Sequence, residues 1–405
     1  MRSTQHETGR NRVKRFTSRA AAFTAVWGLA LMLTAAPLLS GASSVSAAPS
    51  ASASENTKSQ IKVTLNGNEF EPNSAPFMEK GSVYLPLRDI GELLGTVVYW
   101  DSASKTVTMT YPARKVMVKS GSAQADINGQ KVKLTAPVKV INGRTYVPLR
   151  FFSEAIGAGV EWKGSKKTAA ITQSTAYIKG EGVNLSVWLN RKTGEVYTAH
   201  PFESIPTASG KLNVDIQEYV SIEAQYLEGG GIMLYVTDNY GEPHVHNTVY
   251  TAFINKNKQI VKQTQAHYFQ RFEKSVVTFN GKPALNDGKT LTLLTENGDV
   301  TQEYDLQKLG GKNEVYSVQA ISDSYLLIRP NQTGLLTLIN LKDNSATLLY
   351  KELLTPEEQE YSEMNDVPYY GDELKFVGES PEGTLNFSYR SPFTGKERQL
   401  KYVMK

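Results

Sequence analysis

The chain contains a repeated five-residue motif. Tyr84-Leu85-Pro86-Leu87-Arg88 returns 62 residues later as Tyr146-Val147-Pro148-Leu149-Arg150. At this offset, 14 of the 46 positions that pair residues 65–110 with 127–172 are identical. Self-similarity at a fixed period is typical of a duplicated structural unit. Residues 61–111 and 123–172 are therefore expected to fold as two copies of one unit.

Each copy is predicted to be a β-β-α-β-β unit. Asn66-Gly67 is a strong hairpin signal. Pro86 and Pro148 suit the first position of a short helix, where a missing N–H loses no hydrogen bond. Gly95 and Gly157 follow as residues able to end that helix with a positive φ. Apolar residues mark one stripe on each helix: Leu87, Ile90, Leu93 and Leu94 in the first, and Leu149, Phe152, Ala155 and Ile156 in the second.

These motifs carry a resemblance to a known family. The paired Y-[LV]-P-L-R, then L-L-G or A-I-G, then V-x-W and K-T, resembles the copper amine oxidase N-terminal domain, a stalk module of secreted bacterial proteins. The resemblance covers residues 61–173. In the oxidases this domain is an appendage that holds neither copper nor the quinone cofactor. The resemblance therefore implies a structural or interaction module without a cofactor.

The rest of the chain does not resemble the oxidase itself. The enzymes form their quinone from the Tyr of an Asn-Tyr-Asp/Glu motif, but here Gly241 follows Asn239-Tyr240. His244 and His246 lie too close to Tyr240 to match the His-x-His pair of the enzymes. The region after Thr172 is also too short for that catalytic domain. We expect no amine oxidase activity.

The N-terminus has the order of a secretory signal. Basic residues 1–19, the apolar run 20–39 and small residues up to 48 predict a signal peptide over 1–47. An uncleaved membrane anchor is the alternative, since about 20 apolar residues can span a bilayer. A Ser/Ala linker follows over 48–60. Residues 1–47 contain six of the 44 basic residues and only one acidic residue, so this segment accounts for the formal charge of +4. The charge therefore does not indicate a nucleic-acid partner.

Residues 174–405 read as short strands separated by tight turns. Turns such as Asn255–Lys258, Glu296–Asp299 and Lys342–Asn344 recur along this region. The spacing favours a mainly-β domain with a propeller-like array, with a sandwich or two smaller sheets as the alternative. Thr355-Pro356-Glu357-Glu358 predicts a capped helix that runs to about Met364.

His244-Val245-His246 is the one chemically suggestive pair. On a strand, both imidazoles would project from one face and could share a metal ion. The spacing does not choose a third ligand among His200, His267, Glu242 and Asp238. The alternative is two ordinary histidines on an exposed loop or strand, and we predict no metal or other cofactor.

The duplicated Arg and Trp residues also have two interpretations. Arg88 and Arg150 could receive a carboxylate, or could pair with Glu92 and Glu154 one helical turn later. Trp100 and Trp162 could be sugar platforms, or could belong to the core or a sheet face. Duplication of a scaffold favours the structural interpretation for both pairs.

No nucleophile elbow, zinc-protease helix, P-loop or dinucleotide fingerprint is present in the sequence. We therefore expect a secreted or cell-envelope protein without catalytic activity, whose stalk-like module supports a β-rich ligand-binding domain. Its expected partners are wall polysaccharide or another envelope protein, and it would meet the membrane only through an uncleaved leader. An extracellular carbohydrate-active hydrolase or lyase, using Asp and Glu on the β domain, is the alternative.

Overall fold

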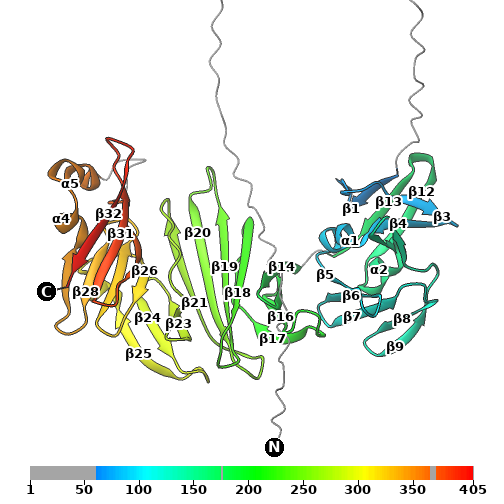
Figure 1. The fold of residues 1–405 in the computed structure, drawn as a ribbon, viewed down its shortest axis with the longest axis horizontal. Coiled ribbons are helices and arrows are strands. Elements are labelled where there is room, and N and C mark those ends of the chain that lie inside the picture. Colours follow the sequence, from blue (N-terminus) through cyan, green and yellow to red (C-terminus); the bar gives the residue numbers. More distant parts are fainter. Residues whose placement is uncertain (1–60, 175–176, 365–370, 405) are drawn as a thin grey trace, which may run out of the picture. The chain divides into compact units, whose positions relative to one another are not determined.

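A computed structural model describes residues 61–174, 177–364 and 371–404, and these are mainly β-strands (Figure 1). The predicted signal peptide and linker, 1–47 and 48–60, lie outside the described residues. Within the described ranges, no helix has both the length and the apolar character needed to cross a membrane.

The elements of the repeat region, residues 61–173, follow one another at the 62-residue offset. Two hairpins precede each of the helices α1 (Leu87–Leu94) and α2 (Leu149–Ala155) and one follows it, so each copy has two more strands before its helix than the predicted β-β-α-β-β unit. The strands are β1 (Lys62–Leu65), β2 (Asn68–Phe70), β3 (Phe77–Glu79), β4 (Ser82–Pro86), β5 (Val97–Asp101), β6 (Thr106–Tyr111), β7 (Arg114–Lys119), β8 (Gln124–Ile127), β9 (Gln130–Lys133), β10 (Lys139–Ile141), β11 (Arg144–Pro148), β12 (Gly159–Lys163) and β13 (Thr168–Thr172), with a 3-10 turn η1 (Gly164–Lys166).

The two copies share their sheets. Strands β4 and β11 pair antiparallel in the sheet β10-β11-β4-β3, and Leu85 faces Val147, its own equivalent in the other copy. Strand β1 of the first copy pairs in parallel with β13 of the second. The strands β5 to β9 form a third sheet that also draws on both copies. Each copy therefore completes the other.

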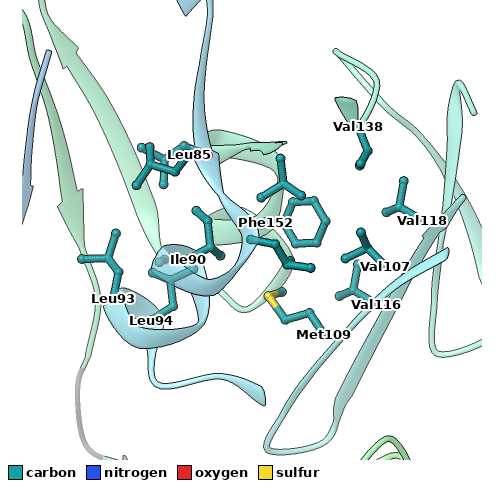
Figure 2. Close-up of a cluster of buried hydrophobic side chains, with 14 of the residues drawn as sticks. Leu85, Ile90, Leu93, Leu94, Val107, Met109, Val116, Val118, Val138 and Phe152 are labelled. Carbon is teal, nitrogen blue, oxygen red and sulfur yellow. The ribbon is translucent and has the colours of Figure 1, made fainter. Parts of the chain in front are cut away.

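A single hydrophobic core lies between these sheets and the two helices. Figure 2 shows Leu85, Ile90 and Leu94 of the first copy beside Phe152 of the second. All four side chains are at most 2% exposed. Because burial of apolar surface is the main favourable term in folding, this shared core holds the two copies together.

The helix ends follow the predicted chemistry. Gly95 ends α1 with φ of 62°, and Gly157 follows α2 with φ of 88°. Both values lie in the left-handed region that glycine reaches without a Cβ clash. Pro86 and Pro148 are one residue earlier than predicted, at the N-cap rather than inside the helix.

The C-terminal region, residues 174–405, begins with an eight-stranded sheet in the order β17-β16-β15-β14-β18-β19-β20-β21. Its edge strands β17 and β21 meet, because Gln263 donates to the Lys211 carbonyl at 3.2 Å and accepts from the Asn213 amide at 2.7 Å. The sheet is therefore curled around its own core. Its strands are β14 (Tyr177–Gly182), β15 (Leu185–Asn190), β16 (Glu195–Ala199), β17 (Thr207–Lys211), β18 (Tyr219–Tyr226), β19 (Ile232–Tyr240), β20 (His246–Ile254) and β21 (Ile260–Phe269).

Three smaller sheets follow, of four, four and three strands. Sheets of four strands have the size of the expected blades, whereas the eight-stranded sheet does not; the propeller-like arrangement stays a prediction. Their elements are β22 (Thr278–Phe279), β23 (Lys282–Asn286), β24 (Thr290–Leu294), β25 (Val300–Asp305), α3 (Leu306–Gly310), β26 (Tyr316–Ile321), β27 (Tyr325–Pro330), β28 (Thr337–Asn340), β29 (Ser345–Leu348), α4 (Leu349–Leu353), α5 (Pro356–Glu363), β30 (Lys375–Glu379), β31 (Thr384–Arg390) and β32 (Glu397–Val403).

Helix α5 begins at the predicted capping box, with Thr355 accepting from the Glu358 amide and Glu358 accepting from the Thr355 amide.

The repeat region contacts the curled sheet through Trp188 on β15. This fully buried indole donates to the Gly95 carbonyl at 2.9 Å and packs with Tyr111.

Candidate functional site

The structure separates the two histidines of the His-x-His pair. His244 lies in the turn before β20, with a positive φ of 64°, and does not share a strand face with His246. Its Nδ1 is 3.3 Å from the Glu218 carboxylate, and its ring meets the edge of Tyr219 at 5.1 Å. The arrangement of both imidazoles on one strand face, one of the two interpretations of this pair, therefore does not form, because the turn between β19 and β20 extends past residue 244.

His246 meets a different histidine instead. Its Nδ1 lies 3.3 Å from Nε2 of His267 on β21. In the sheet register His246 faces Phe269, so His267, two residues away, projects from the same face. Tyr240 stacks on His246 with ring centroids 5.2 Å apart, and its centroid lies 6.3 Å from that of His267. We call Tyr240, His246, His267 and Phe269 the histidine patch.

The electrostatics of the patch favour the neutral form of His267. Burial, and then the nearby His246, lower the pKa of His267. The Thr248 hydroxyl lies 3.3 Å from Nδ1 of His267 and orients its ring. A neutral His267 has one donor and one acceptor ring nitrogen, so it can share one N–H···N hydrogen bond with His246.

The other candidate ligands do not join the patch. His200 stacks on Tyr226 with centroids 3.7 Å apart. Asp238 is fully buried and accepts from the backbone amides of Gln217 and Glu218. Glu242 is exposed in the turn. Within the ranges described, no group of three or more His, Cys, Asp or Glu side chains could hold a metal ion.

The duplicated arginines differ between the copies. Arg150 pairs with Glu154 at 3.2 Å, as the structural interpretation predicts. No hydrogen bond or ion pair of the Arg88 side chain occurs among the described residues, so its predicted pairing with Glu92 does not form. Arg88 lines a cavity instead.

Two cavities occupy equivalent places in the repeat region. The first-copy cavity, of about 580 Å³, and the second-copy cavity, of about 190 Å³, lie beside the starts of α1 and α2. Both tryptophans pack against the core while lining these cavities. The paired lining positions are Pro86 and Pro148, Leu87 and Leu149, Arg88 and Arg150, Trp100 and Trp162, Gly143 and Gly81, Arg144 and Ser82, Thr145 and Val83, and Asn73 and Thr135.

Sequence reasoning did not identify two of these features, although it named His267 among four candidate ligands. The partnership of His246 with His267 depends on the register of β20 and β21, which residue spacing alone does not reveal. The cavities were also missed, although the 62-residue alignment shows a difference at one of them. Asp89 in the first copy is Phe151 in the second. That difference was the available signal.

Comparison with known proteins identifies the repeat region. Residues 64–171 match the family model of the copper amine oxidase N-terminal domain. A Brevibacillus choshinensis protein named "Protease inhibitor" is 27% identical over 232 residues, which cover 51% of this chain and 71% of that protein. The chain thus contains a copper amine oxidase N-terminal domain, as the sequence motifs indicated.

Likeness to solved structures is low. A dihydro-heme d1 dehydrogenase NirN complex aligns with a TM-score of 0.24 and 8% identity. The alignment covers 67% of this chain and 53% of the dehydrogenase chain. A luciferin-regenerating enzyme aligns with a TM-score of 0.26 and 10% identity, over 76% of this chain and 90% of the other. TM-scores this low do not show a shared fold.

Proposed function

We propose that this is a secreted or cell-envelope protein without catalytic activity. In this proposal the copper amine oxidase N-terminal domain supports a β-rich region that binds wall polysaccharide or another envelope protein. The observation that carries the proposal is that domain at residues 64–171, since in the oxidases it is an appendage rather than the catalytic part. Its contact with the β-rich region through Trp188 and Gly95 is consistent with a supporting role.

Secretion is supported by the sequence of residues 1–47. A basic segment, an apolar run and small residues stand in the order that signal peptidase recognises. Expression in a secreting bacterium, followed by N-terminal sequencing of the protein in the medium, tests this point. A new N-terminus at Ala48 is expected, and retention of the intact leader in the membrane would contradict it.

The histidine patch is a candidate ligand surface on the β-rich region. Phe269 is 47% exposed, and the nearby Tyr219, which contacts His244, is 66% exposed. Aromatic side chains are enriched at binding surfaces because they bury a large area at a low cost in conformational entropy. Tyr219 on β18 and Phe269 on β21 lie at the same end of the sheet, on opposite faces in the strand register, and their exposure supports binding of a partner at this end.

A cell-wall pull-down tests the binding proposal. The purified protein should be retained on purified cell wall at physiological salt, and the double variant Tyr219→Ala, Phe269→Ala should be retained several-fold less. Val183→Ala is the matched control, since Val183 is 92% exposed in the turn between β14 and β15 of the same sheet. Absence of retention would refute wall binding, and equal retention of both variants would place the surface elsewhere.

Protease inhibition is a second candidate function. It is favoured by the name of the Brevibacillus choshinensis relative, "Protease inhibitor". Incubation of a trypsin-like, a subtilisin-like and a metal-dependent protease with a molar excess of the purified protein tests it. Stoichiometric loss of one protease activity is expected under this candidate. Full activity of all three proteases would count against it.

A further inference from the structure

The first-copy cavity is lined by charged and aromatic side chains from separate elements. Arg88 and Asp89 come from the first turn of α1, Trp100 from β5 and Arg144 from the start of β11. Its volume of about 580 Å³ lies within the range of about 300–1,000 Å³ that small-ligand pockets occupy. It can therefore accept one or two sugar-sized rings.

Asp89 is an incompletely satisfied acceptor in this cavity wall. Its side chain is 1% exposed, and its Oδ1 accepts from Asn73 Nδ2 at 2.8 Å. Its Oδ2 is buried and has no hydrogen-bond partner among the residues described. Buried polar atoms nearly always have a partner, so this oxygen calls for a donor. A hydroxyl group of a bound molecule would supply one.

Two guanidinium groups of the same cavity have no carboxylate partner. Arg88 makes no ion pair in the described part of the chain, and Arg144 donates a hydrogen bond to the neutral Ser74 hydroxyl. Both side chains are exposed at the cavity. Guanidinium groups bind carboxylates through two parallel hydrogen bonds. The pair therefore favours an acidic group on the ligand.

Trp100 gives the cavity a flat apolar wall. It is half-buried, so part of the indole stays accessible while the rest packs on the core. Such a surface suits the C–H face of a sugar ring, whose hydroxyls point to the sides. The cavity thus combines an apolar face, an acceptor for hydroxyls and a place for a carboxylate.

The second-copy cavity is an internal comparison for these assignments. It keeps the scaffold positions Pro148, Leu149 and Trp162, but Phe151 and Ser82 stand where the first copy has Asp89 and Arg144. Its arginine is already paired with Glu154. Folding of the unit therefore does not require the charged set, which is confined to the larger cavity.

We propose that the first-copy cavity binds an acidic saccharide. The sugar carboxylate lies between Arg88 and Arg144, a hydroxyl donates to Oδ2 of Asp89, and the ring packs on Trp100. This goes beyond the proposed function, because it gives a binding site to the domain that was assigned only a supporting role.

Calorimetric titration of the full protein tests the proposal. The probes are a glucuronic-acid disaccharide, the matching neutral glucose disaccharide, inorganic phosphate and diglycine. The acidic disaccharide should bind, and the neutral one should bind at least tenfold more weakly. Equal binding of the two disaccharides, tighter binding of phosphate or diglycine, or no binding of the acidic disaccharide would overturn the proposal.

Three variants locate the site. Asp89→Asn and Arg144→Ser should each weaken binding of the acidic disaccharide at least tenfold. Serine is chosen at position 144 because Ser82 occupies the equivalent position in the second-copy cavity. Arg150→Gln in the second-copy cavity is the matched control and should leave the affinity unchanged. Should Asp89→Asn fail to fold, as circular dichroism would show, Arg144→Ser alone decides. Unchanged affinity in that variant would overturn the assignment.

Discussion

The two cavities of the repeat region are built at equivalent positions, yet they differ in size and in charge. The first-copy cavity is lined by Asp89, Arg144 and an arginine without an ion pair, whereas the second-copy cavity is lined by Ser82 and the paired Arg150, and the equivalent of Asp89 does not line it. The positions that both copies keep serve the helix start and the core. The difference shows that residues common to both copies stabilise the shared fold. A binding site should therefore be sought among the residues that differ between the copies.

The largest expected effect concerns the core that both copies share. Phe152→Ala removes a fully buried ring and should lower the free energy of unfolding of the repeat region by about 3–5 kcal/mol. Because Phe152 packs with residues of both copies, amide protons of β6 and β13 should lose protection together in hydrogen exchange. Loss of protection in β13 alone would show that the copies are independent units.

A smaller effect is expected at the two helix ends. Gly95→Ala and Gly157→Ala each place a Cβ on a residue with positive φ, with nothing within 4 Å to clash. Backbone strain alone should therefore cost roughly 1–2 kcal/mol in each copy. Urea denaturation of both variants measures this. A clearly larger cost at Gly95 than at Gly157 would show that the contact of the Gly95 carbonyl with Trp188 adds to the strain.

The smallest expected effect separates the two arginines. Arg150→Ala should lower the free energy of unfolding by about 0.3–0.5 kcal/mol, because its ion pair with Glu154 is exposed and joins residues one helical turn apart. Arg88→Ala should leave the unfolding free energy unchanged within error, since no ion pair is lost. The same urea titration compares the two variants. Equal costs would mean that Arg88 also stabilises α1.

Much of the repeat region was predictable from local signals. The prolines at the helix starts and Gly95 and Gly157 at the helix ends act within a few residues of where they occur, and the 62-residue repeat shows that both copies carry the same local signals. The capping box at Thr355 is of the same kind. Such signals work because turns and caps depend on the conformation of one or two residues.

The long-range pairing was not predictable in the same way. Alternating apolar residues indicate a strand but do not name its neighbour, so the pairing of β4 with β11 and of β1 with β13 had no signal. The eight-stranded sheet was unexpected for the same reason, since turn spacing suggested blades of equal size. At the candidate sites, the contact of His246 with His267 needs the strand register. Asp89 was visible only as a mismatch between the copies.

The parallel pairing of β1 with β13 has a mechanical consequence. The chain enters the repeat region at Lys62, and leaves it after Thr172, at the opposite end of this strand pair. Tension applied between the two ends pulls β1 and β13 along their length in opposite directions. The hydrogen bonds between the strands are then stretched all at once, rather than opened one by one as in a hairpin peeled from its open end. A module connected in this way is suited to transmit tension along the chain without unravelling.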